Sequence, residues 1–145
     1  MSKKSNLSEQ DISTKYIVPS IQNSGWDIMT QVSEQKFITD GRIILSGKNT
    51  KRGERKRPDF VLSYRKNFPL AIIEVKDNNH SIENGIQQAI NYAEILDTPF
   101  AYSTNGDGYL EHDFLTGKQR SLSINQLPSP EELYTRYKES KGIGE

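Results

Sequence analysis

The sequence predicts an α/β (α+β) fold in which helices flank a mixed β-sheet and the elements follow the order αβββαβ. Two apolar runs, residues 59–64 and 70–76, are separated by a short polar turn, which is typical of an antiparallel hairpin. Residues 82–96 place apolar side chains at i, i+4, i+7 and i+8, the spacing of an amphipathic helix. The apolar run at residues 100–103 predicts a further strand after that helix.

The first third of the chain predicts one helix and two strands. Residues 7–22 are expected to be helical, although Pro19 leaves the C-terminal half of that helix open, because proline lacks the N–H that an interior turn needs. Gly25 is expected to end the helix. Strands are predicted at residues 26–32 and 42–45.

The last third predicts short edge strands and a final helix. A glycine-containing turn at residues 105–108 separates residues 100–103 from two expected edge strands, at residues 109–110 and 114–115. The final helix is predicted near residues 130–140, because Ser129 can cap it and Pro130 fits its first turn.

Residues 46–57 form a polar loop with six basic residues and one acid. One interpretation is a solvated hairpin tip. The other is a phosphate-contacting loop, which its position just before Asp59 favours.

Composition limits the possible functions. At 145 residues the chain is the size of one domain, and it holds no cysteine, which excludes disulfides and cysteine-ligated zinc. Its 19 basic and 19 acidic residues balance, so any DNA affinity must be local or come from other chains. No apolar run is long enough to span a membrane and no signal peptide is evident, so a cytoplasmic protein is expected.

The strongest candidate site consists of Asp59, Glu74 and Lys76. Alternate residues of a strand face the same side, so Glu74 and Lys76 project together while Val75 faces away. Charges in the apolar run 70–76 need compensation, which a divalent metal and a phosphate would supply. Carboxylates of Asp59 and Glu74 and the carbonyl of Val75 suit Mg²⁺, and Lys76 could hold an attacking water.

A Glu-x-Lys pair also occurs by chance on exposed strands as an alternating solvated face. Three observations favour a catalytic interpretation here: the strand is otherwise apolar, an Asp follows a proline at the preceding strand, and an amphipathic helix follows at once. A second acidic group, Glu111-His112-Asp113, could bind a cation, but a cluster at an edge turn explains it more simply.

Asp59 and Glu74-Val75-Lys76 resemble the signature of the PD-(D/E)xK nuclease superfamily, which implies a restriction-endonuclease-like core. Further segments resemble the N-terminal nuclease domain of the R (restriction, motor) subunit of type I restriction endonucleases. These segments are residues 8–19, Gly25-Trp26-Asp27, and residues 69–76, 88–94, 100–106 and 127–133. Together they cover nearly all of residues 8–139.

The resemblance implies a Mg²⁺-dependent endonuclease of double-stranded DNA, in which Mn²⁺ can substitute for Mg²⁺. It implies that Glu9 approaches the metal site and that Gln88 and Tyr92 form the family's Gln-x-x-x-Tyr motif. Modification and specificity subunits are the implied partners, through the full-length R subunit.

The resemblance also implies a division of the chain into three parts: residues 1–6 as a flexible tail, 7–128 as the nuclease domain, and 129–145 as a C-terminal helix and junction toward a motor domain. The chain's loose ending suits such a boundary. ATP would act only through that motor, because no Gly-x-x-x-x-Gly-Lys-[Ser/Thr] sequence occurs here. Weak or no cleavage is therefore expected from the chain in isolation. The alternatives are a non-catalytic nuclease-like module for DNA binding or assembly, and a stand-alone nuclease such as a junction resolvase.

Overall fold

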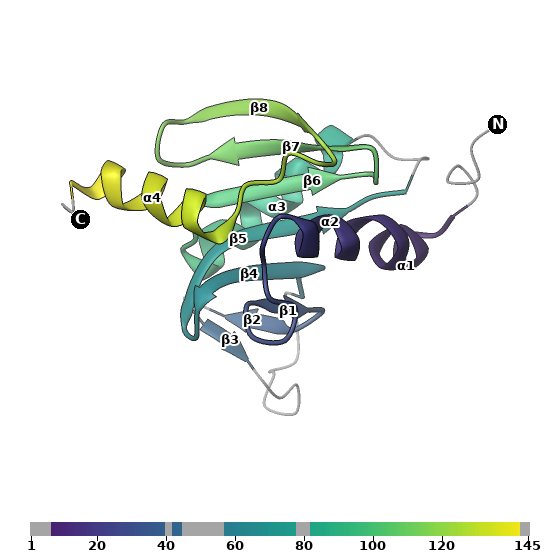
Figure 1. Cartoon of the computed structure of the whole chain (residues 1–145), viewed down its shortest axis with the longest axis horizontal. Coiled ribbons are helices and arrows are strands. Elements are labelled where there is room, and N and C mark those ends of the chain that lie inside the picture. The colour runs from purple at the N-terminus through teal and green to yellow at the C-terminus, as the bar shows by residue number, and fades with distance from the viewer. Residues whose placement is uncertain (1–6, 40–41, 45–56, 78–81, 143–145) are drawn as a thin grey trace.

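The structure is a computed structural model that describes residues 7–39, 42–44, 57–77 and 82–142. A six-stranded sheet has the order β1-β4-β5-β6-β7-β8, and β2 and β3 form a separate two-stranded sheet (Figure 1). The strands are β1 (Val32–Glu34), β2 (Phe37–Thr39), β3 (Arg42–Ile44), β4 (Phe60–Arg65), β5 (Phe68–Val75), β6 (Phe100–Thr104), β7 (Gly108–Asp113) and β8 (Lys118–Ser123). The helical elements are α1 (Glu9–Ile12), η2 (Ser13–Ile17), α2 (Val18–Asn23), α3 (Ile82–Leu96) and α4 (Pro130–Lys141).

The predicted hairpin and the predicted long helix are confirmed. Strands β4 and β5 pair antiparallel around a turn in which Asn67 takes the left-handed conformation, with φ 64°. Helix α3 then crosses over and the chain returns as β6, which pairs parallel to β5. The sheet is therefore mixed, as expected, and the carboxyl ends of β5 and β6 lie side by side, because parallel strands end at the same edge.

The predicted N-terminal helix is present, and Pro19 does not break it. The five residues of η2 form a π-helical stretch directly before α2, which carries Pro19 in its first turn. Proline is tolerated in a first turn because its missing N–H needs no partner there. Gly25, with φ 104°, follows the helix end as predicted.

Two predictions for the first third need correction. Residues 27–31 form a turn instead of a strand, because Asp27 accepts the Met29 N–H at its side chain and the Gln31 N–H at its carbonyl. A short strand that the sequence did not predict, β2, pairs with β3, whereas the strand at residues 42–45 is confirmed for 42–44. Residue 45 and most of the basic loop 46–57 lie outside the described residues.

The C-terminal strands also differ from the prediction. Strand β7 is longer than expected and lies inside the sheet, between β6 and β8. Residues 114–115 belong to the turn after β7, where the Asp113 carboxylate accepts the Leu115 N–H at 2.8 Å. The strand at this edge of the sheet is β8, which was missed because its six residues are mostly polar and exposed.

Helices cover both faces of the sheet. Helices α1, α2 and α4 lie on one face and α3 on the other (Figure 1). The final helix begins as predicted, with the Ser129 side chain accepting the Glu132 N–H at 3.1 Å. A stack of Tyr64 and Tyr134, with ring centroids 4.0 Å apart, holds α4 against the β4–β5 hairpin. No helix within the described ranges has the length and apolar character needed to cross a membrane.

Candidate active site

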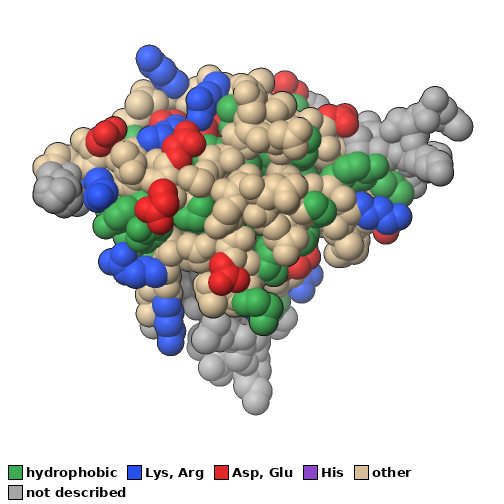
Figure 2. Space-filling view, viewed as in Figure 1, with side chains coloured by type: hydrophobic (Ala, Val, Ile, Leu, Met, Phe, Trp, Pro, Cys, Tyr) green, Lys and Arg blue, Asp and Glu red, His purple; other side chains and the backbone are tan. Residues whose placement is uncertain are grey.

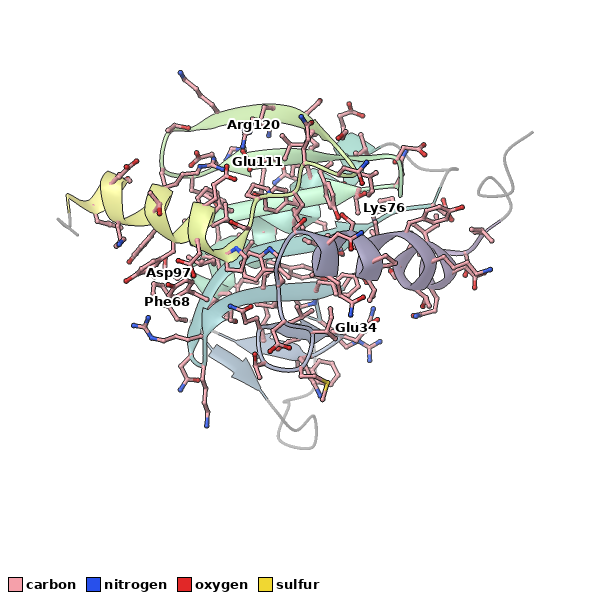
Figure 3. All side chains as sticks on the ribbon, viewed as in Figure 1. Glu34, Phe68, Lys76, Asp97, Glu111 and Arg120 are labelled. Carbon is pink, nitrogen blue, oxygen red and sulfur yellow. The ribbon has the colours of Figure 1, made fainter. Side chains whose placement is uncertain are left out.

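The predicted acids meet where β5 ends and β4 begins. In the antiparallel register Phe60 pairs with Ile73, so Asp59 falls opposite Glu74, just beyond the last backbone pair. Lys76 follows at the carboxyl end of β5, where its N–H donates to the Thr104 carbonyl at 2.8 Å. Figure 3 shows Lys76 at the α1 end of the sheet, while Phe68 and Asp97 lie at the opposite end. Carboxyl ends of parallel strands are where α/β sheets usually bind ligands.

Asp59 and Glu74 hold each other's strands through reciprocal hydrogen bonds. The Asp59 N–H donates to Glu74 Oε2 at 2.8 Å, and the Val75 N–H donates to Asp59 Oδ2 at 2.8 Å. The carboxylates thus replace the backbone acceptors where the strand ladder stops. The side chain of Val75 is 1% exposed on the other face, so the predicted alternation of Glu74, Val75 and Lys76 is confirmed.

The paired acids repel each other in a largely dry environment. Burial, followed by the charge of Asp59, raises the pKa of Glu74 from 4.5 to about 8. Burial also raises the pKa of Asp59, against hydrogen bonds from the Val75 N–H and Gln35 that lower it. Two adjacent carboxylates whose ionisation is opposed in this way form a donor set that a divalent cation would suit.

Lys76 is oriented by helix α3. Its Nζ donates to Gln88 Oε1 at 3.1 Å, and Gln88 Nε2 donates to the Tyr92 hydroxyl at 3.1 Å. The structure therefore brings the Gln-x-x-x-Tyr pair to the candidate lysine. Gly85 makes the close approach of α3 possible, because a Cβ there would collide with Ser103 Oγ and lie 3.0 Å from Lys76 Cγ.

Helix α1 brings Glu9 toward the same site. The Ser8 side chain caps α1, which places Glu9 in the first turn, and the charge of Glu9 contributes to the raised pKa of Glu74. Within the described ranges, no group of three or more His, Cys, Asp or Glu side chains is close enough to hold a metal ion. Two carboxylates suffice for Mg²⁺, which usually completes its octahedron with waters and substrate phosphate.

The structure places the three residues of the second acidic candidate, Glu111-His112-Asp113, in different surroundings. Glu111 and Asp113 are buried beside Arg136, whereas the His112 ring faces the other way and lies 3.1 Å from Gln119 Nε2. Alternation along β7 divides the three side chains between two faces, so they do not form one group. The expected edge-turn cluster is also wrong, because β7 lies inside the sheet and Glu111 and Asp113 are buried.

Two polar neighbours of the site were missed by the sequence reasoning. Gln35 Nε2 donates to Asp59 Oδ1 at 2.8 Å, and the charge of Glu34 contributes to the raised pKa of Asp59. Glu34 is the last residue of β1, and Gln35 follows it in the segment that joins β1 to β2. No local sequence signal identifies them, because their proximity depends on the pairing of β1 with β4.

Comparison with known proteins identifies the family. Residues 28–128 match the family described as the type I restriction enzyme R protein N terminus (HSDR_N). The chain belongs to this family. The HSDR_N match contains Asp59, Glu74, Lys76 and the Gln88-Tyr92 pair, whereas Glu9 lies before it.

Two relatives extend the HSDR_N match over nearly the whole chain. The endonuclease subunit of the type I restriction enzyme EcoAI from Escherichia coli is 41% identical over 137 residues, which are 92% of this chain and 17% of that protein. A solved fragment assigned to the HsdR subunit of a type I restriction enzyme from Vibrio vulnificus is also 41% identical, with a TM-score of 0.81. That alignment covers 96% of this chain and 27% of the fragment, so the chain spans only a small part of each relative. The structural match fits the restriction-endonuclease-like fold that the resemblance implied.

The raised pKa of Glu74 gives the HSDR_N chain a specific dependence of stability on pH. An acid whose pKa is raised by folding favours the folded state below its unfolded pKa of 4.5, and this contribution is lost as pH rises through about 8. A pKa shift of this size changes the free energy of unfolding by about 3–5 kcal/mol. In EDTA, we expect the free energy of unfolding to fall between pH 5 and pH 8.5, and to fall less in Glu74→Gln.

Urea unfolding at the two pH values measures this difference. Glu139→Gln is the matched control, because Glu139 is an exposed acid and should keep the wild-type pH dependence. Equal pH dependence in wild type and Glu74→Gln would contradict the expectation.

Proposed function

We propose that this chain is the nuclease part of a type I restriction enzyme R subunit and cleaves double-stranded DNA with Mg²⁺. The observation that carries the proposal is a pair of adjacent carboxylates beside Lys76: the buried Glu74 accepts the Asp59 N–H, and the half-buried Asp59 accepts the Val75 N–H. The family and the name of the E. coli relative, an endonuclease subunit, support the same activity.

Different side chains of the site would bind the metal and position the attacking water. Asp59, Glu74 and the Val75 carbonyl would hold Mg²⁺, with Glu9 close by. When bound, the ion activates water and stabilises negative charge on the phosphate. Lys76 would hold the attacking water and neutralise developing charge, because its ammonium is a compact cation. Gln88 would keep the Lys76 ammonium at the site, since the two side chains are 3.1 Å apart, and Tyr92 would hold Gln88.

DNA capture would depend on other parts of a full-length R subunit. The formal net charge is zero, and Figure 2 shows acidic and basic side chains interspersed on the described part of the viewed face. Motor, modification and specificity components would supply ATP-driven movement and sequence recognition in the cytoplasm. We therefore expect weak cleavage or none from this chain alone.

Metal titration of the isolated chain tests the proposed site directly. Calorimetric titration with Mn²⁺ at pH 8 should show binding to wild type that Glu74→Ala weakens by at least about tenfold, because one of two carboxylate ligands is lost. Glu139→Ala, at an exposed acid of α4, should bind as wild type does. Unchanged Mn²⁺ affinity in Glu74→Ala would overturn the metal site and favour a non-catalytic module.

A further inference from the structure

Gln35 has an unusual backbone for its residue type. It follows β1 and takes the left-handed conformation, with φ 59°. A side chain with a Cβ rarely adopts this conformation, and residues held in it concentrate at functional sites. Gln35 is exposed, so burial does not explain why the chain keeps this geometry.

The pairing of three strands places Gln35 in line with both acids. Glu34 pairs with Phe60 across β1 and β4, and Phe60 pairs with Ile73 across β4 and β5. The next position outward on each strand is therefore Gln35, Asp59 and Glu74. These three side chains extend one row across the sheet at the edge where the candidate metal site lies.

Gln35 binds the residue beside it twice. Its backbone N–H donates to the Asp59 carbonyl at 3.0 Å, and its Nε2 donates to Asp59 Oδ1 at 2.8 Å. The Val75 N–H holds the other oxygen, Oδ2, at 2.8 Å. Both oxygens of the Asp59 carboxylate are therefore fixed by donors from neighbouring segments of the chain, and each oxygen keeps a second lone pair for a ligand.

We infer that Gln35 is a positioning residue, which fixes the Asp59 carboxylate in the orientation that binds a divalent cation. The inference rests on the proposed function. An amide suits this role because it donates a hydrogen bond to the carboxylate without adding negative charge beside Asp59 and Glu74. Partners that orient a metal ligand commonly contribute about 10- to 100-fold to metal affinity.

Glycine substitution separates the amide from the backbone. Gly adopts positive φ freely, so Gln35→Gly removes the side-chain hydrogen bond without straining the turn. Asn67, with φ 64° in the β4–β5 turn, lies at the other end of the hairpin and makes Asn67→Gly the matched control. Thermal midpoints of both variants show whether each remains folded at the titration temperature.

Mn²⁺ titration of the 145-residue chain is the first measurement. Gln35→Gly should bind Mn²⁺ about 10- to 100-fold more weakly than wild type, whereas Asn67→Gly should keep wild-type affinity. Wild-type affinity in Gln35→Gly would overturn the inference and leave the proposed metal site standing.

Hydrogen exchange of the Val75 amide, measured by NMR without metal, is the second measurement. The Val75 N–H donates to Asp59 Oδ2, so a loosened Asp59 should expose it, and Gln35→Gly should exchange it faster than Asn67→Gly does. If wild type binds no Mn²⁺, the proposed function fails, and hydrogen exchange alone decides whether Gln35 positions Asp59. Equal exchange rates of the Val75 amide in the two variants would overturn that positioning role.

Discussion

Replacing Lys76 by alanine is expected to lower the rate of DNA cleavage by about 10²- to 10³-fold, the usual cost of removing one group that stabilises charge in the transition state. Lys76 is a cation whose charge acts to lower the pKa of both Asp59 and Glu74. The measurement is plasmid cleavage by a complete type I enzyme whose R subunit carries the substitution.

Two controls make this result specific. Lys66→Ala removes a lysine at the opposite end of the β4–β5 hairpin and should cleave normally. ATP hydrolysis by the complete enzyme should persist in Lys76→Ala, since the motor is elsewhere in our proposal. Loss of both cleavage and ATP hydrolysis would indicate misfolding, and unchanged cleavage would remove Lys76 from the catalytic group.

Gly85→Ala is a second test of the same lysine that leaves its charge in place. The added methyl group would collide with Ser103 Oγ and press on the stem of Lys76, so the ammonium should move away from Gln88. Cleavage should fall, by less than in Lys76→Ala.

Replacing Arg136 by alanine is expected to destabilise the fold by about 3–5 kcal/mol, because it leaves buried acids without their main partner. Arg136 binds Glu111 and Asp113, at 3.1 and 2.7 Å from Nη2, and its guanidinium lies 4.6 Å from the centroid of the Phe100 ring. The Glu111 side chain is only 1% exposed. This network joins α4 to β7, so its loss should loosen the C-terminal helix.

Arg120 provides the matched comparison. It also binds Glu111, at 2.7 Å, but its side chain is 50% exposed, so Arg120→Ala should cost no more than about 1 kcal/mol. Figure 3 shows both Glu111 and Arg120 on the β7–β8 hairpin. Urea unfolding of the two variants measures the difference, and equal losses would contradict the role assigned to burial.

The hydrogen bonds between Arg136 and Glu111 also predict that the stability of the fold depends on pH. Burial raises the pKa of Glu111, but hydrogen bonds from Arg136, Arg120 and Tyr102 outweigh it, and the pKa lies below its ordinary value of 4.5. An acid with a depressed pKa stabilises the fold above its unfolded pKa and loses that contribution as pH falls through the folded value. The gap in stability between wild type and Arg136→Ala should therefore narrow below pH 4.5.

The sequence predicted those parts of the fold that local periodicity specifies. The hairpin of β4 and β5, helix α3 and helix α4 follow their apolar spacing and capping residues closely. The prediction errors fall in segments that have neither a regular apolar spacing nor a capping residue. Strand β8 is polar and exposed, and residues 27–31 turn because the Asp27 side chain competes with strand pairing.

The candidate site was predictable for a similar reason. Glu74 and Lys76 share a strand face, and Gln88 and Tyr92 share a helix face, so each pair follows from the geometry of one element. Which roles these residues perform stays a prediction for the metal and cleavage experiments.

The sequence by itself identified the candidate site residues and the family to which the chain belongs. Only the tertiary structure decided which distant side chains contact Asp59 and the buried Glu111. Gln35 reaches Asp59 because β1 pairs with β4 in one register. Arg136 lies 25 residues after Glu111 in the sequence and reaches it because α4 packs over the sheet. Such contacts depend on the packing of separate segments, which no local pattern encodes.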